Sequence, residues 1–273
     1  LLLGVACLPV QAQTGSGEGL LVTSDRVIVE NLAVEDTKGD GVKSKGSDQI
    51  TFRNLRVEWT NGPAAENGAY GVYPASSRNV LVENVTVKGA ADAGIYVGQS
   101  ENIIVRNSRA EFNVAGIEIE NSFKADVYNN IATHNTGGIL IFDLPNLPVQ
   151  GGHDIRVFDN QVVDNDTPNF APKGNIVAIV PKGMGIMVMA NRNVHVFGNT
   201  LSGNATAHVL IAAYPNDYED DAYMFVPRGV YVHGNTYGEG GSAPDGEVGK
   251  TISDVSGTPV PDIVWDGVTT IPE

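Results

Sequence analysis

Side chains that can transfer protons recur through the first half of the sequence. They are Lys43, Tyr73, Tyr96, Glu118, Glu120 and Asp143. Tyrosine and lysine serve as bases, whereas carboxyl groups serve as acids, as bases or as oxygen ligands of hard cations. We therefore take these six residues as candidate catalytic residues.

Two reactions are compatible with these residue types. Removal of a proton next to a carboxylate needs a base, such as tyrosine or lysine, and a cation that neutralises the carboxylate. Glu118, Glu120 and Asp143 would then hold Ca²⁺ through their oxygen atoms. Hydrolysis of a glycosidic bond instead needs two carboxyl groups about 5 to 9.5 Å apart, one of them with a raised pKa. The same three carboxyl groups can supply that pair.

Other chemistries lack their sequence signatures. The five histidines are scattered and form no metal-spaced pair. The chain has neither a glycine-rich phosphate loop nor a Gly-x-Ser-x-Gly elbow. A serine nucleophile is therefore not expected, and Ca²⁺ is the only cofactor that the residues suggest.

A repeat of 22 residues or slightly more positions the candidate side chains. Each unit opens with a small residue that is followed by alternating apolar positions. Successive openings lie 22, 30, 23, 22, 22, 47, 23 and 21 residues apart, so we expect one insertion of eight residues and one step that holds two units. The openings are Gly19, Gly41, Gly71, Gly94, Gly116, Gly138, Gly185, His208 and Gly229.

Two further apolar segments follow in each unit. The second resembles Val27–Val29 and is followed by an asparagine, and the third is a short pair such as Leu32 and Val34. We expect the asparagines to stack at one corner, where their amides bond to one another and to the turn backbone. The predicted ladder comprises Asn31, Asn54, Asn84, Asn107, Asn130, Asn160, Asn199 and Asn235.

Three short strands per unit predict a coil that closes on itself. Each strand alternates with a period of two and has one apolar face. The gaps of two to five residues are too short for a helix, so each strand must stack on its equivalent in the next unit, about 4.8 Å away. The sequence predicts an all-β protein, a parallel β-helix of about nine coils with three short strands per coil, over residues 13–238.

The repeats resemble those of right-handed parallel β-helix proteins, which include pectate lyases, alginate epimerases and many exported bacterial proteins. The resemblance rests on segments such as Asp92–Asn102 and Glu111–Asn121, and it extends from residue 19 to residue 238. It implies a single-stranded, right-handed, pectin-lyase-like β-helix. Because this fold carries lyases, epimerases, hydrolases and adhesins alike, the resemblance does not single out one reaction.

The first strands of successive units are expected to form an outward-facing wall. In order, the wall would contain Lys43 and Lys45, Tyr73, Tyr96, Glu118 and Glu120, Leu140 and Phe142, Met187, Leu210 and Tyr231. We expect the insertions 59–69, 142–152, 165–184 and 214–227 to border this wall and turn it into a groove. Aromatic side chains at the rim of a groove suit sugar rings. The alternative is an ordinary solvated face.

The resulting functional prediction is an exported protein that acts on polysaccharide. Uronate lyase or epimerase chemistry in the groove is favoured. A non-catalytic carbohydrate-binding or cell-surface solenoid and a glycoside hydrolase remain as alternatives, so the sequence leaves open whether the protein is an enzyme. The oligomeric state is not indicated.

Charge and the two ends of the chain narrow the setting. The net charge of −15 argues against nucleic acid and anionic membrane surfaces as partners. Outside the first residues, no apolar stretch reaches the roughly 18 residues that a membrane span needs. Residues 1–12 have the pattern of a signal-peptide remnant with cleavage after Ala12, which predicts a secreted or periplasmic protein. Residues 239–273, rich in Gly, Pro and Asp, are expected to form a C-terminal cap or a partial tail.

Overall fold

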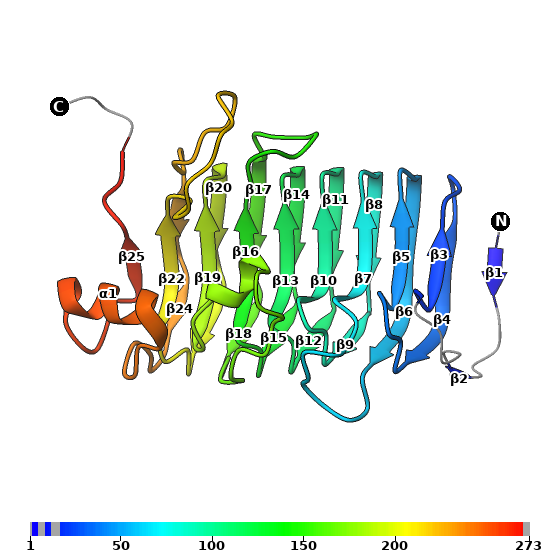
Figure 1. Cartoon of the computed structure of the whole chain (residues 1–273), viewed down its shortest axis with the longest axis horizontal. Coiled ribbons are helices and arrows are strands. Elements are labelled where there is room, and N and C mark those ends of the chain that lie inside the picture. The colour runs from blue at the N-terminus through cyan, green and yellow to red at the C-terminus, as the bar shows by residue number, and fades with distance from the viewer. Residues whose placement is uncertain (1, 5–8, 12–16, 270–273) are drawn as a thin grey trace.

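The chain winds into an elongated solenoid in which each strand lies beside its equivalent in the next coil (Figure 1). The computed structural model describes residues 2–4, 9–11 and 17–269. Strands of neighbouring coils pair in parallel and in register, so the predicted parallel β-helix is confirmed. Within these residues no helix is long and apolar enough to cross a membrane.

Two sheets form the sides of the solenoid, and the first sheet carries the candidate residues. Its nine strands are β3 (Leu20–Val22), β5 (Val42–Lys45), β7 (Tyr70–Ala75), β10 (Ala93–Gly98), β13 (Ala115–Glu120), β16 (Gly137–Phe142), β19 (Met184–Met189), β22 (Ala207–Ala212) and β25 (Ile263–Trp265).

The second sheet contains the other two strands of each coil. One arm consists of β4 (Ile28–Glu35), β6 (Asp48–Glu58), β8 (Arg78–Glu83), β11 (Glu101–Arg106), β14 (Phe123–Tyr128), β17 (His153–Phe158), β20 (Arg192–Phe197) and β23 (Tyr231–His233). The short third strands are β9 (Thr86–Lys88), β12 (Arg109–Glu111), β15 (Ile131–Thr133), β18 (Gln161–Val163), β21 (Thr200–Ser202) and β24 (Thr236–Tyr237). In the first two coils, β4 and β6 continue around the corner and supply both arms.

Additional elements lie at the two ends of the solenoid. β1 (Leu2–Gly4) and β2 (Pro9–Gln11) pair with β4. The helix α1 (Gly246–Ser256) lies at the other end, where β25 adds a last strand to the first sheet (Figure 1). The predicted cleavage site at Ala12 falls outside the described residues, so the signal peptide stays a prediction.

Aliphatic side chains stack inside the coils and form one continuous core. Ile95, Ile117, Ile139 and Ile186 are direct register partners, and all four are fully buried. Burial of each such side chain contributes about 1.5 to 3 kcal/mol relative to leaving it exposed. Because every coil repeats the same inward positions, each isoleucine packs on another above it and another below it.

The longest repeat step holds one coil, so the prediction of two units in it was wrong. β16 pairs directly with β19, although their openings at Gly138 and Gly185 are 47 residues apart. Two loops, at 143–152 and 164–183, take up the additional residues. The repeat count failed because insertions and additional coils lengthen a step in the same way.

The last predicted first strand was also misplaced. The segment that opens at Gly229 leads into β23, which pairs with β20 in the second sheet. Tyr231 therefore lies opposite His195 and is not part of the wall. The strand that follows β22 in the first sheet is β25, in the segment predicted to be a cap or tail.

The predicted asparagine ladder consists of two sets that differ by one residue in register. Asn31, Asn54, Asn84 and Asn107 are exposed residues with positive φ, a conformation that asparagine tolerates well. The buried ladder occupies the next position and comprises Asn130, Asn160, Asn199 and Asn235, each amide donating to the next side-chain oxygen. A second ladder, which the sequence analysis missed, runs through Asn113, Asn135, Asn165 and Asn204.

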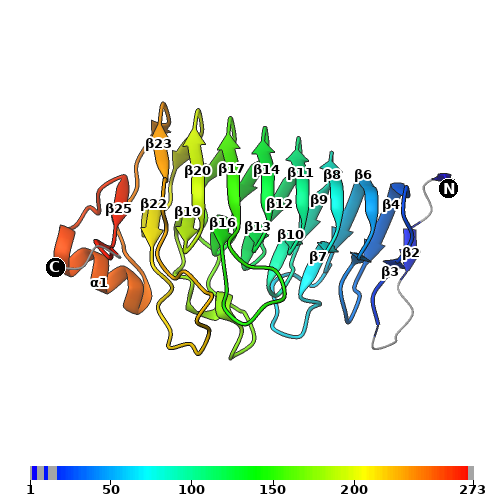
Figure 2. The ribbon, with the colours of Figure 1, turned by 90° about the horizontal axis from the view of Figure 1, so that it is seen from above.

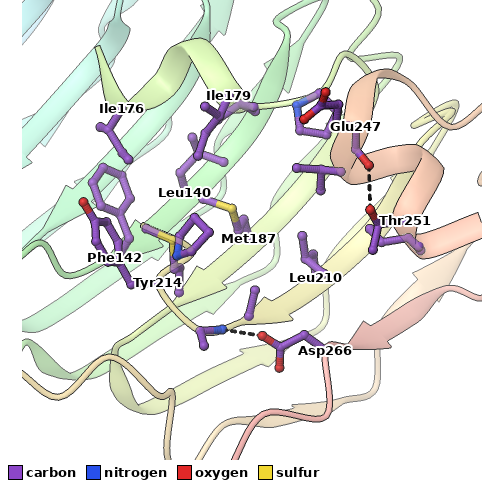
Figure 3. A pocket seen from close by; sticks show the side chains of 18 of the residues that line it. Leu140, Phe142, Ile176, Ile179, Met187, Leu210, Tyr214, Glu247, Thr251 and Asp266 are labelled. Carbon is purple, nitrogen blue, oxygen red and sulfur yellow. Dashed lines mark hydrogen bonds between the residues drawn. The ribbon is translucent and has the colours of Figure 1, made fainter. Parts of the chain in front are cut away.

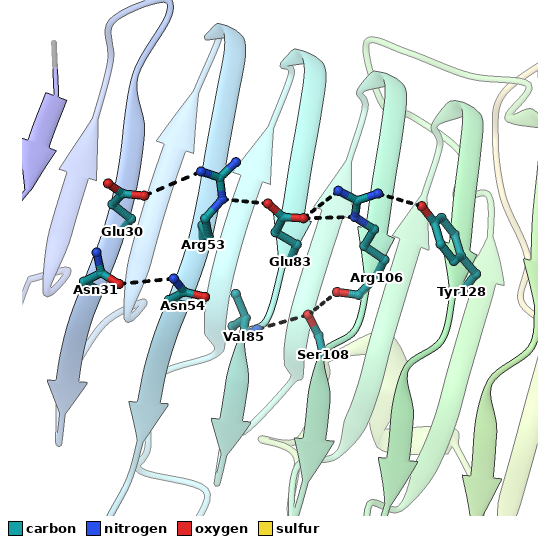
Figure 4. Close-up of polar contacts among 9 residues, drawn as sticks. All are labelled: Glu30, Asn31, Arg53, Asn54, Glu83, Val85, Arg106, Ser108 and Tyr128. Carbon is teal, nitrogen blue, oxygen red and sulfur yellow. Dashed lines mark hydrogen bonds and ion pairs between the residues drawn. The ribbon is translucent and has the colours of Figure 1, made fainter.

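A chain of ion pairs crosses the outer face of the second sheet. Arg53 lies between Glu30 and Glu83, and Arg106 joins Glu83 to the hydroxyl of Tyr128 (Figure 4). The bonds from Arg106 and Arg53 lower the pKa of Glu83. Because these pairs are partly exposed, they contribute less to stability than the buried amide ladders do.

Replacement of Asn160 by alanine tests the buried ladder. The Asn160→Ala variant leaves the Asn130 amide and backbone N–H without their acceptor, so we expect the free energy of unfolding to fall by about 2 kcal/mol. Urea denaturation followed by circular dichroism measures the change. Asn216→Ala, in an exposed loop, is the matched control. Equal stabilities of the two variants would contradict the role of the ladder.

Candidate functional site

The first sheet brings five of the six predicted residues into one connected group on its outer face. Lys43 Nζ lies 4.6 Å from the centroid of the Tyr73 ring, and the rings of Tyr73 and Tyr96 are 4.7 Å apart. Tyr96 is the register partner of Glu118, and its hydroxyl donates a hydrogen bond of 2.8 Å to Glu120 Oε1. The predicted vertical order is therefore present. Lys45 is exposed and lies outside the group.

The centre of this group is Glu118, a carboxyl group that is almost completely buried. Its side chain is held on β13 with 1% of the residue exposed, and Oε1 has no hydrogen-bond partner. Burial, together with the charges of Asp92 and Glu120, raises its pKa well above the usual range of a glutamate. Burial thus favours the protonated form of Glu118, which can donate a hydrogen bond.

Asp92 and Glu120 complete a set of three neighbouring carboxyl groups. Burial raises the pKa of Glu120 to about 7, although the hydrogen bond from Tyr96 acts to lower it. Burial likewise raises the pKa of Asp92 to about 6, although hydrogen bonds from Asn175 and Tyr70 partly counteract it. Glu120 and Asp92 therefore titrate near neutrality, where acid–base catalysis is most effective.

The sequence analysis missed Tyr70, Asp92 and Asn175. Tyr70 stacks on Tyr73 with a centroid distance of 4.5 Å, and Asn175 Nδ2 donates a hydrogen bond of 3.0 Å to Asp92. Tyr70 lies one residue and Asp92 two residues before the strand-opening glycine of its coil, so the repeat alignment held a signal for them. Asn175 lies in an insertion, and no repeat register places it. We refer to Tyr70, Tyr73, Tyr96, Asp92, Glu118 and Glu120 as the tyrosine–carboxyl cluster.

Lys43 and the tyrosines are less available as bases at neutral pH than the residue types suggest. Burial alone would lower the pKa of Lys43, but its bonds to Asp40 (2.9 Å) and Glu18 (3.3 Å) outweigh burial and raise it. Burial, reinforced by the charge of Glu120, raises the pKa of Tyr96 far above that of a free tyrosine. Burial also raises the pKa of Tyr73. At neutral pH these groups donate hydrogen bonds and are not free bases.

The hydrogen bonds of Asp143 indicate a structural role for this residue. Its two carboxylate oxygens accept bonds from the Gly152 backbone N–H (2.6 Å) and from Asn191 Nδ2 (2.8 Å), which hold the base of the 143–152 loop. Burial raises its pKa to about 6. Glu118, Glu120 and Asp143 therefore do not fit the predicted Ca²⁺ site, and the described residues contain no group of three or more His, Cys, Asp or Glu arranged to hold a metal ion.

The wall is covered, so it is neither the open groove nor the solvated face that the sequence suggested. Tyr96, Asp92, Glu118 and Glu120 are all buried. The insertions extend from the side of the solenoid that carries the first sheet (Figure 2). One of them contains the short 3₁₀ helix η1 (Ile176–Ile179), and the preceding Asn175 anchors this segment to Asp92.

The outer face becomes apolar at the coil that follows Glu118. Leu140 is the register partner of Glu118, Phe142 that of Glu120, and Met187 and Leu210 continue the row. These side chains form the floor of a pocket of about 510 Å³ that lies beneath the η1 segment and beside α1 (Figure 3). The wall thus has a polar half and an apolar half, and the η1 segment reaches both of them.

Comparison with known proteins assigns the class. The observed fold defines a parallel β-helix solenoid with an acidic cluster on one sheet. The family model described as a right handed beta helix region matches residues 12–152, just over half of the sequence, and the chain belongs to this family. No curated protein sequence matches the chain.

Several solved structures share the fold. A periplasmic alginate epimerase superposes with a TM-score of 0.59 and 15% identity, over 80% of this chain and 51% of the epimerase. An alginate lyase from a Paenibacillus strain superposes with a TM-score of 0.56 and 16% sequence identity. The superposition covers 87% of this chain and 79% of the lyase. An endo-xylogalacturonan hydrolase from Aspergillus tubingensis superposes with a TM-score of 0.51 and 12% sequence identity. The superposition covers 80% of this chain and 63% of the hydrolase. This chain spans about half the length of the epimerase, and at these identities the likeness shows the fold alone.

The raised pKa of Glu120 predicts how stability depends on pH. A carboxyl group whose pKa rises on folding from 4.5 to about 7 keeps its proton where the unfolded chain has lost it. Folding therefore becomes less favourable as the pH rises through this range, by about 3 kcal/mol for one such group. Glu120→Gln should remove this part of the pH dependence, so urea midpoints at pH 4.5 and 7.5 should differ less than in the wild type. Glu66→Gln, at an exposed position, is the control, and a wild-type-like pH dependence in Glu120→Gln would contradict the assignment.

Proposed function

We propose that the protein acts outside the cytoplasm on a uronate-containing polysaccharide, by removing the proton at C5 of a uronate residue in the tyrosine–carboxyl cluster. The observation that carries this proposal is Glu118, a buried carboxyl group with a raised pKa whose Oε1 has no partner. A buried polar atom without a partner costs about 1 to 3 kcal/mol. A substrate group that bonds to Glu118 would remove that cost.

Glu118 supplies the neutralising group that the reaction needs. Proton removal at C5 places charge on the adjacent carboxylate, and a neutral carboxylic acid can donate a hydrogen bond to that charge. No cation is then required at this position. Because the donor is buried, its hydrogen bond is stronger than it would be in water.

Glu120 is the base in this scheme. Its Oε1 accepts the hydroxyl of Tyr96, which leaves Oε2 to take the C5 proton. With a pKa of about 7, it is partly ionised at neutral pH and can both accept and return a proton. In a lyase, the C4–O bond breaks, a C4=C5 double bond forms and the proton passes to the departing oxygen. In an epimerase, an acid on the other side of the sugar ring donates a proton to the opposite face of C5, and Glu120 loses the removed proton to solvent.

Access to the cluster requires the η1 segment to move. Asn175 donates its only described side-chain bond to Asp92, so one hydrogen bond ties this segment to the carboxyl groups. Once the segment is displaced, Tyr70 and Tyr73, which are half-buried, present aromatic faces on which a sugar ring can pack.

Glycoside hydrolysis is the second candidate, and the different pKa values of Asp92 and Glu120 favour it. At neutral pH, Glu120 keeps more of its proton than Asp92 does, so it would act as the acid and Asp92 as the base. A third reading, carbohydrate binding without turnover, uses the same cluster only to hold sugar.

An assay on a panel of polysaccharides separates these readings. A lyase yields an unsaturated product that absorbs ultraviolet light, an epimerase incorporates solvent deuterium at C5, and a hydrolase releases reducing ends without unsaturation. We expect Glu118→Gln and Glu120→Gln to lower kcat/KM by about 10² to 10⁴.

Glu101→Gln on β11, a partly exposed glutamate of the second sheet, is the control and should keep wild-type activity. Circular dichroism verifies that the variants are folded. Full activity in folded Glu118→Gln and Glu120→Gln would refute the proposed site, and binding of acidic glycan without any turnover would replace the enzyme by a binding protein.

A further inference from the structure

The apolar half of the wall forms a pocket that the proposed reaction does not use. Its floor is Leu140, Met187 and Leu210, in register on three successive strands, and its sides are the η1 segment and α1 (Figure 3). A volume of about 510 Å³ lies within the range of sites that bind small molecules. Nothing in the described chain fills it.

Aliphatic side chains also remain exposed at its mouth. Ile179 of η1 is 46% exposed and Val268 is 37% exposed, and both line the pocket. Branched aliphatic side chains that gather at the entrance to an apolar pocket indicate an apolar ligand.

The charges that border the pocket exclude one large class of apolar ligand. Among the described residues that line the pocket, Glu247 and Asp266 are the only charged ones, and none is Lys, Arg or His. Asp266 accepts hydrogen bonds from the backbone N–H groups of Ala213 (2.6 Å) and Val268 (3.0 Å), which hold its side chain at the rim. An aliphatic chain with an anionic headgroup, such as a fatty acid, would meet only like charge here.

The position of the pocket indicates what the headgroup is. Leu140 and Phe142 of its lining pair with Glu118 and Glu120 of the tyrosine–carboxyl cluster. The η1 segment lines the pocket through Ile176 and Ile179, and it reaches the cluster through the bond from Asn175 to Asp92. A ligand with a sugar in the cluster and an aliphatic group attached to it would occupy both halves of the wall under one cover.

We infer that the pocket binds an uncharged aliphatic substituent, an alkyl or acyl group, that is attached to a sugar of the glycan. The choice of sugar as the headgroup rests on the proposed function, whereas the aliphatic nature of the occupant rests on the pocket itself. The protein would then select substituted glycan over bare glycan.

Calorimetric titration with n-hexyl and n-octyl glucoside, below the concentrations at which they form micelles, tests this inference. Each buried methylene should tighten binding about fourfold, so octyl glucoside should bind about tenfold or more tightly than hexyl glucoside. Glucose tests the headgroup alone, and octanoate tests a chain of equal length with a charged end. Both should bind more weakly than octyl glucoside by about tenfold or more.

Two variants of matched chemistry locate the site. Ile179→Asp places a charge at the mouth of the pocket and should weaken octyl glucoside binding by about tenfold or more. Val255→Asp places the same charge on α1 at a position that is 87% exposed and outside the pocket lining, and it should bind like the wild type. Both positions are exposed, so both variants should fold.

The outcomes separate this inference from the proposed function. Equal binding of octanoate, absence of any binding, or equal effects of the two variants would overturn it. A wild-type dimer that Ile179→Asp converts to a monomer in sedimentation analysis would also overturn it, because a second copy would then cover the pocket. Because binding is measured without turnover, loss of catalysis in the polysaccharide assay would leave a positive binding result intact.

Discussion

The fixed register between neighbouring coils is the constraint on which the structure depends. Parallel strands lie about 4.8 Å apart, so each side chain has an equivalent side chain directly above and below it. Inside the coils this requirement selects aliphatic residues that pack on one another, as Ile95, Ile117 and Ile139 do. At the corners it selects amides that bond along the axis, as in the ladder from Asn130 to Asn235. The fixed register therefore determines how the core packs and also provides hydrogen-bond partners for the polar groups of the turns.

The same register concentrates ionisable groups on the outer face. Glu118 follows Tyr96, and Glu120 is within hydrogen-bonding distance of the Tyr96 hydroxyl, because the strands that carry them are neighbours. On an open sheet such carboxyl groups would be solvated and ionised. Here the inserted segments exclude water from them, and burial raises the pKa values of Glu118, Glu120 and Asp92 together. The rigid strands thus fix the positions of the carboxyl groups, and the inserted segments that cover these groups raise their pKa values.

Much of this arrangement could be predicted from residue spacing, and the failures have specific physical causes. The order from Lys43 through Tyr73 and Tyr96 to Glu118 followed from strand alternation, which is strictly local. The 47-residue step was misread because loop length carries no information on pairing, and Tyr231 was misplaced because its segment resembles a first strand but pairs with β20. The bonds of Asp143 to Gly152 and Asn191 could not be predicted, because they depend on a loop whose path the repeat does not fix.

The sequence by itself determined the fold, the strand period and the vertical order of the candidate side chains, because these follow from a short repeat and nearest-neighbour stacking. Only the tertiary structure decided which side chains are covered, which carboxyl groups have raised pKa values and where the apolar pocket lies. Those properties depend on contacts between distant segments, such as Asn175 with Asp92 and the η1 segment with the floor at Leu140. No repeat places an insertion in space, so the electrostatic state of Glu118 could be determined only once its cover was known.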